Sequence, residues 1–188
     1  MGSEVLGDRR KALEDAFFTK QDAKLRQELA EKEDLKAKKA ALAEVSGIGD
    51  DAVLERLVAL DIQPDTLTAL TLVPLIEVAW ADGNIDDNEQ AAILQAASTT
   101  GLSKGSPSAQ LLEAWLKHPP TPDVRRAWED YVSSLLTTLD ADAKSALKND
   151  ILGRARSVAE AAGGFLGVGN KVSKSEQAVL EELEAVFE

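Results

Sequence analysis

The 188 residues suit one domain of ordinary size with an appendage, and the net charge of -12 argues against sequence-independent nucleic-acid binding, which needs lysine and arginine to neutralise phosphates. The chain has no cysteine, which excludes disulfides, thiolate metal ligands and cysteine nucleophiles. No apolar run approaches the ~20 residues that cross a bilayer and residues 1–7 lack the features of a signal peptide, so we expect a cytoplasmic protein.

Residues 8–45 form the first predicted element. They contain no glycine or proline and are dense in strong helix formers. Their ten basic and nine acidic residues nearly balance, whereas residues 46–188 carry eleven basic and twenty-three acidic residues. Leucine and phenylalanine keep a seven-residue spacing only in part, because Lys32 and Lys39 interrupt it. We predict one long charged helical arm without a sustained coiled-coil seam.

Phe17 and Phe18 are the candidate partner-binding residues of this arm. Adjacent residues of a helix point ~100° apart, so one packing face cannot bury both rings. One ring can pack on the protein's own bundle, which leaves the other for a second chain, and aromatic anchors often dominate interface energy. We therefore expect a protein partner, or self-association, through this helix.

A body over residues 50–188 follows the arm. Asp50 can cap a short amphipathic helix, and Pro64 can begin another. Pro74 fits the first turn of a helix over residues 73–81, because its nitrogen has no hydrogen bond to lose there.

The rest of the body contains further helix starts. Asp86 precedes Glu89 by three residues, which is the spacing of a capping box for a helix over residues 87–100. Other predicted cap residues are Ser106, Thr121, Asp140 and Ser173. Since no segment alternates as a strand does, we predict an all-α fold, a compact helical bundle with the long N-terminal helix attached.

Two stretches of the body resemble each other. Residues 72–81 align with residues 152–161, and the segment from Asn84 aligns with the one from Lys171. Each copy reads as helix, glycine turn, apolar residue, cap and helix, with Glu89 in the first copy matched by Glu176 in the second. The pattern predicts two pseudo-repeated helical hairpins around a common centre.

The first copy, VAWADGNIDDNEQAAIL, resembles the TerB-like (tellurite-resistance) family, and the resemblance covers residues 70–187. It implies a compact helical bundle whose acidic glycine turns face a common groove, in a non-enzymatic module linked to stress responses and divalent cations. The second copy departs from the pattern, because Ala162 or Gly169 stands where the family would place an aspartate.

Asp82, Asp86 and Glu89, helped by Glu176, are the candidate metal ligands, for calcium or another divalent cation. The segment resembles the second half of an EF-hand loop, but Val78 occupies a position that needs an oxygen ligand, so it is not an EF-hand. The alternative is structural: the aspartates serve the turn and the glutamate serves the capping box. No cofactor is assigned with certainty.

Residues 8–32 resemble, more weakly, the start of the zeta-type inhibitor of bacterial ATP synthase, which implies a helix that inserts into a larger enzyme. Two functions therefore stand open. The first is a protein-interaction or scaffold module, and the alternative is a regulator that inhibits an enzyme through its N-terminal helix.

Catalysis is not expected. His118 is the only histidine, and no nucleophile elbow accompanies it. The glycine run at residues 163–170 lacks the strand and the Gly-Lys-Ser/Thr of a phosphate loop. We expect a turn there, whose apolar side chains would contact a partner or a membrane surface only if they were exposed.

Overall fold

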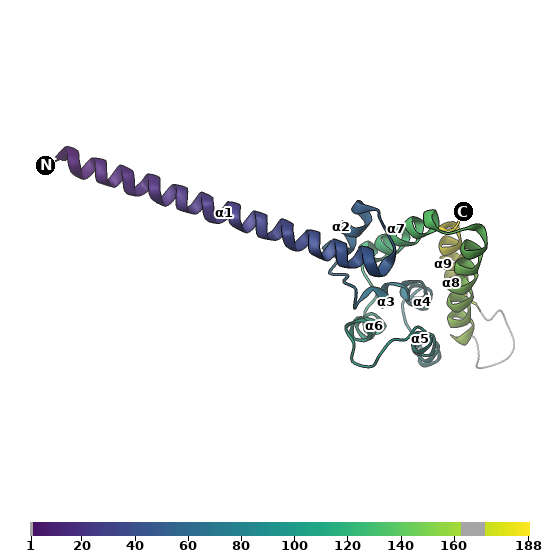
Figure 1. The fold of residues 1–188 in the computed structure, drawn as a ribbon. Coiled ribbons are helices and arrows are strands. Elements are labelled where there is room, and N and C mark those ends of the chain that lie inside the picture. The colour runs from purple at the N-terminus through teal and green to yellow at the C-terminus, as the bar shows by residue number, and fades with distance from the viewer. Residues whose placement is uncertain (1, 163–171) are drawn as a thin grey trace. The chain divides into compact units, whose positions relative to one another are not determined.

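The computed structural model describes the backbone of residues 2–162 and 172–188, and the side chains of these residues except 2–19 and 22. Throughout this part of the chain every regular element is a helix (Figure 1), which confirms the all-α prediction. The helices are α1 (Gly2–Ser46), α2 (Asp51–Ala59), α3 (Leu67–Leu70), α4 (Val73–Ala79), α5 (Asp87–Thr99), α6 (Pro107–Lys117), α7 (Pro122–Thr138), α8 (Ala141–Ala162) and α9 (Lys174–Ala185).

The chain divides into two compact units, residues 1–40 and residues 41–188. The first unit is the greater part of α1. Its helix is continuous, as the absence of glycine and proline from residues 8–45 predicted. The second unit takes in the last turns of α1, where Leu42 is fully buried, and it also buries Ile48 just after the helix ends.

The centre of the second unit is α4. Every residue of this short helix is buried except Glu77, and α4 contacts α5, α7, α8 and α9. Pro74 lies in its first turn, as predicted, and costs no hydrogen bond there. The core around α4 is mainly leucine, isoleucine, valine and alanine, with Trp115 and Trp128 as its buried aromatic residues. Burial of such side chains is the main source of stability in a helical bundle.

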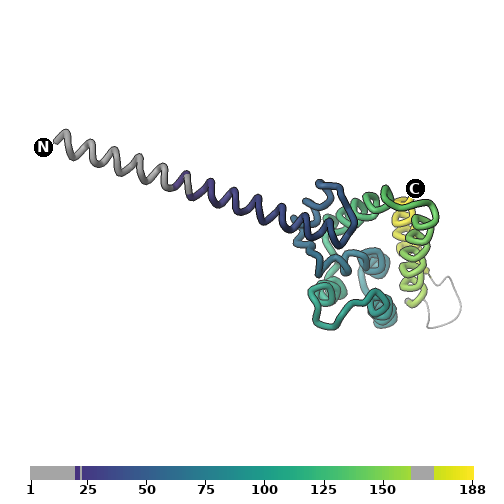
Figure 2. The backbone as a smooth tube through the Cα atoms, viewed as in Figure 1, coloured from purple at the N-terminus to yellow at the C-terminus, as the bar shows by residue number. Residues whose placement is uncertain are grey.

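Two helical hairpins surround this centre. One consists of α4 and α5, and the other of α8 and α9. Helix α8 packs against both α4 and α5, while α9 packs against α4. Figure 2 traces the chain through α7 into α8, which lies beside α9. The two segments that resemble each other in sequence therefore form equivalent hairpins packed on one another.

Local caps begin most of these helices where the sequence predicted. The side chains of Asp50, Asp86, Ser106 and Ser173 accept hydrogen bonds from the first turn of α2, α5, α6 and α9. Asp140 does the same for α8 through the Ala143 amide, at 2.8 Å.

Pro64 does not begin a helix. The Gln63 amide donates to the Thr66 hydroxyl oxygen at 2.8 Å, and this hydrogen bond closes a turn across Pro64. Helix α3 starts only at Leu67. The Thr66 and Leu67 amides both donate to the Gln63 carbonyl, at 3.0 and 2.9 Å, so Pro64 lies in a single turn that leads into α3.

Candidate functional site

The acidic turn before α5 is built by local hydrogen bonds. The Asp82 carboxylate accepts from the Asn84 amide at 3.1 Å, across Gly83, whose φ of 92° favours glycine. Asp86 then accepts from the Asn88 and Glu89 amides, both at 2.8 Å. In return Glu89 accepts from the Asp86 amide at 2.8 Å, which completes the capping box.

The second hairpin repeats this arrangement with a different cap residue. The Ser173 hydroxyl accepts from the Glu176 amide at 3.1 Å, and Glu176 accepts from the Ser173 amide at 2.5 Å. Serine therefore replaces the aspartate of the first box. Only the first copy places a carboxylate at its helix cap.

Both box glutamates are buried, unlike most glutamates in proteins. Glu89 is 4% exposed and Glu176 is 5% exposed. Burial raises the pKa of Glu89 to about 7; its hydrogen bond from the Asp86 amide opposes this rise, while the negative charges of Asp86, Glu176 and Asp82 add to it. The structure thus brings the other three predicted ligand residues into electrostatic reach of Glu89, and for Glu176 spacing along the chain could not predict this proximity.

Electrostatic proximity is not coordination. Across the side chains that the structure describes, no group of three or more His, Asp or Glu could hold a metal ion. Hydrogen bonds to backbone amides already engage at least one oxygen of each predicted ligand residue. Divalent cations such as calcium require six or more oxygen ligands. The four predicted residues therefore do not present a preformed cation site.

A second carboxylate cluster was not foreseen from the sequence. Arg125 of α7, which is 19% exposed, contacts Glu77 of α4 at 2.5 Å, Glu129 of α7 at 2.8 Å and Glu182 of α9 at 3.2 Å. The one available signal was Glu77 itself, a lone charge in the apolar run of residues 72–81.

This cluster ties together three helices of the second unit. Burial raises the pKa of Glu77, and its attraction to Arg125 opposes the rise. A half-buried pair of this kind is costly to break, because the charge left behind is uncompensated. The cluster thus stabilises the packing of α4, α7 and α9.

The predicted aromatic anchors, Phe17 and Phe18, lie on the α1 backbone, but their side chains fall outside the described residues. The glycine run at residues 163–170 also lies outside the described residues. Along the part of α1 whose side chains are described, Leu25 is 54% exposed and Leu29 is 52% exposed. The sequence had shown these leucines as apolar positions without singling them out.

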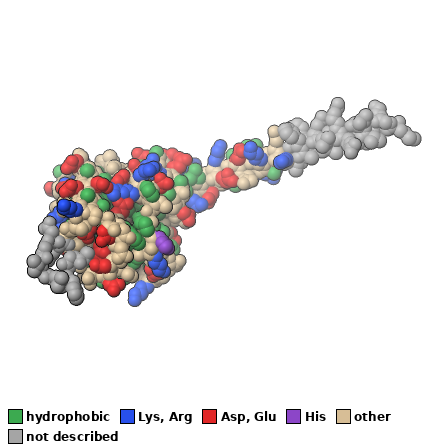
Figure 3. Space-filling view, turned by 180° about the vertical axis from the view of Figure 1, so that it is seen from behind, with side chains coloured by type: hydrophobic (Ala, Val, Ile, Leu, Met, Phe, Trp, Pro, Cys, Tyr) green, Lys and Arg blue, Asp and Glu red, His purple; other side chains and the backbone are tan. Residues whose placement is uncertain are grey.

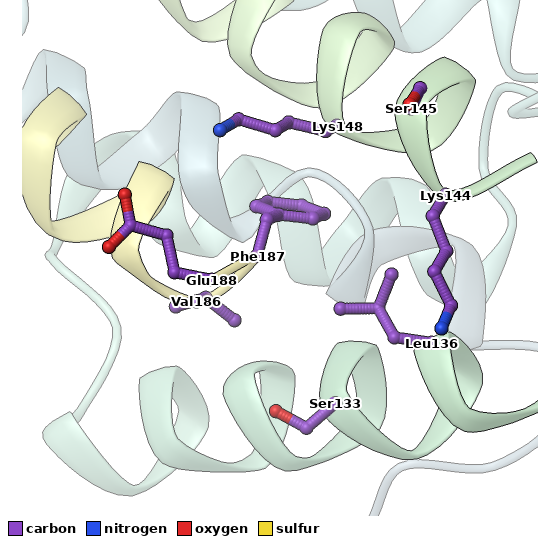
Figure 4. Close-up of a pocket in the computed structure, with 8 residues that line it drawn as sticks. All are labelled: Ser133, Leu136, Lys144, Ser145, Lys148, Val186, Phe187 and Glu188. Carbon is purple, nitrogen blue, oxygen red and sulfur yellow. The ribbon is translucent and has the colours of Figure 1, made fainter. Parts of the chain in front are cut away.

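A cavity of about 310 Å³ lies between the end of α7, the start of α8 and the turn after α9. Figure 4 shows the Phe187 ring between Lys148 and Leu136. Lys148 pairs with Glu184 at 2.8 Å, and Glu188 also lines the cavity. Because carboxylates offset its lysines, the cavity has no net charge that would select an anion.

Comparison with models of known families, with curated proteins and with solved structures finds no match to this chain. None of the described helices combines the length and apolar character needed to span a bilayer.

Proposed function

We propose that this protein is a non-enzymatic interaction module that binds a protein partner through α1. The observation that carries the proposal is the exposure of this helix. Every described side chain of residues 20–34 is exposed, including Leu25 and Leu29. A helical segment whose described side chains are all exposed obtains little stability from packing.

Pairs of side chains four residues apart support the helix instead. Lys24 and Glu28 lie 3.6 Å apart, and Lys38 and Asp34 lie 2.8 Å apart. In Figure 3 lysine and arginine alternate with acidic side chains along the coloured part of α1. Each such pair contributes about 0.3–0.5 kcal/mol to the stability of the helix. Leu25 and Leu29 take no part in these pairs.

The leucines are spaced for recognition. Leu25 and Leu29 are four residues apart and therefore share one face of α1. A pair of apolar residues at this spacing is how a helix anchors in the groove of a partner. We keep Phe17 and Phe18 as proposed anchors of the same helix. The TerB-like resemblance adds the expectation of a stress-response scaffold, and the zeta-inhibitor resemblance adds a large enzyme as one class of partner.

Affinity capture with the full chain tests the proposal. The experiment compares wild type, Leu25→Asp/Leu29→Asp and the control Leu94→Asp, which changes a leucine of similar exposure on α5. We expect one defined protein to be retained by wild type and by the control, and to be lost from the double variant. Equal retention by all three variants would refute binding through α1. If the retained protein is an ATP synthase, an assay of its hydrolysis decides between scaffold and inhibitor.

A further inference from the structure

The second unit carries an apolar cavity that the proposed function does not use. It measures about 500 Å³ and lies between α5, α6 and the turn that joins them. Leu94, Leu102 and Leu112 line it. Leu112 is buried and belongs to the core, but Leu94 is 44% exposed at the edge of the cavity. The same face thus presents both an exposed apolar side chain and a hollow beside it.

The cavity is poorly built for a small ligand. Ligand sites usually combine an apolar lining with a few polar groups fixed in position. Here the polar lining residues are Ser98, Ser103, Lys104 and Glu113, and all four are exposed. No buried polar side chain is available to orient a small molecule.

The charges at the rim favour a second copy of the same chain. Lys104 and Glu113 have opposite charges, and neither forms an ion pair with any residue that the structure describes. In a two-fold dimer, the surface of one copy meets the same surface of the other, so residue i contacts j and j contacts i. A face that carries one lysine and one glutamate is complementary to itself under such a rotation.

We propose that two copies of this protein associate through the α5–α6 face. Leu94 of each copy enters the cavity of the other, and Lys104 of each copy faces Glu113 of its partner. The interface closes on itself, because the exposed leucine and the hollow belong to one surface. This association is independent of α1 and of the proposed partner.

Sedimentation of the full chain over roughly 1 to 300 µM tests the dimer, a range chosen because small interfaces are weak. We expect wild type to dimerise, Leu94→Glu to remain monomeric, and the matched control Leu25→Glu to behave as wild type. A monomeric wild type over the whole range overturns the proposal. So does a dimer that survives Leu94→Glu or is lost in Leu25→Glu.

The charge pairs are tested by exchange. Lys104→Glu or Glu113→Lys alone places like charges opposite each other, and we expect each to weaken the dimer about tenfold, since each of the two symmetric pairs contributes a factor of about two to five. The double variant Lys104→Glu/Glu113→Lys should restore the wild-type affinity. Failure of the double variant to recover, with circular dichroism unchanged, contradicts this orientation of the two copies.

Cysteine cross-linking gives a readout that does not depend on affinity, because the chain has no native cysteine. Leu94→Cys should form a disulfide-linked dimer on mild oxidation, and Leu25→Cys should not. Cross-linking through residue 25 alone would place the contact on α1 and overturn the proposal, while leaving the proposed function standing. If instead no partner is captured through α1 while Leu94→Cys still cross-links, the proposed function is refuted and the dimer stands.

Discussion

Replacing Glu89 by glutamine should stabilise this protein at neutral and alkaline pH. Glutamine keeps an oxygen that accepts from the Asp86 amide, so the hydrogen bond of the capping box is retained. It removes the negative charge that burial and the neighbouring carboxylates disfavour. The substitution therefore separates the cost of the buried charge from the benefit of the cap.

The magnitude follows from the pKa. That of Glu89 rises from its ordinary 4.5 to about 7, so the folded chain holds this proton to a higher pH than the unfolded chain. Its contribution to the free energy of unfolding is complete below pH 4.5, declines as the pH rises, and is lost above pH 7. At about 1.4 kcal/mol per pH unit, the loss amounts to about 3 kcal/mol.

Urea unfolding followed by circular dichroism at pH 4.5, 6, 7 and 8 measures this effect. Between pH 4.5 and 7 the wild type should lose about 3 kcal/mol more stability than Glu89→Gln. At pH 8 the variant should be the more stable protein. The control Glu160→Gln changes an exposed glutamate of α8 and should leave the pH dependence of the wild type unaltered.

One result would refute the reasoning. If Glu89→Gln is less stable than wild type at pH 8, the ionised carboxylate gains more from the Asp86 amide and the helix N-terminus than it loses by burial. Glu89 would then be a stabilising cap at every pH.

Three further predictions concern the rest of the molecule. A chain restricted to residues 41–188 should fold with a cooperative transition, whereas Leu42→Ala in the full chain should cost about 2–5 kcal/mol in urea unfolding, because Leu42 is fully buried. Arg125→Met should destabilise the protein by about 3 kcal/mol, and adding Glu77→Gln should recover part of this loss, since no buried charge is then unpaired. Calorimetry with Ca²⁺, Mg²⁺ and Mn²⁺ should give no saturable heat below roughly 1 mM, because the side chains that the structure describes include no preformed set of ligands; heat that Asp82→Asn abolishes would show that the carboxylates rearrange around an ion.

The start of a helix can be predicted where a local interaction fixes it. Asp86 with Glu89, and Ser173 with Glu176, were recognised because a capping box spans only four residues. Pro74 was placed correctly because a proline in the first turn of a helix loses no backbone hydrogen bond. Pro64 was not, because it lies in a single turn, closed by the Thr66 amide on the Gln63 carbonyl, and the regular helix begins only at Leu67.

The sequence by itself determined the helices, the continuity of α1 and the equivalence of the two hairpins, since these depend on contacts within a few residues or on direct comparison of two segments. Only the tertiary structure decided that Glu89 and Glu176 are buried within electrostatic reach of each other, and that Glu77 finds Arg125 across α4 and α7. It also decided that Leu94 stands exposed beside a cavity while Ile93, its neighbour in the chain, is fully buried. Burial and long-range pairing arise from how the helices pack, and helical spacing leaves several packings open.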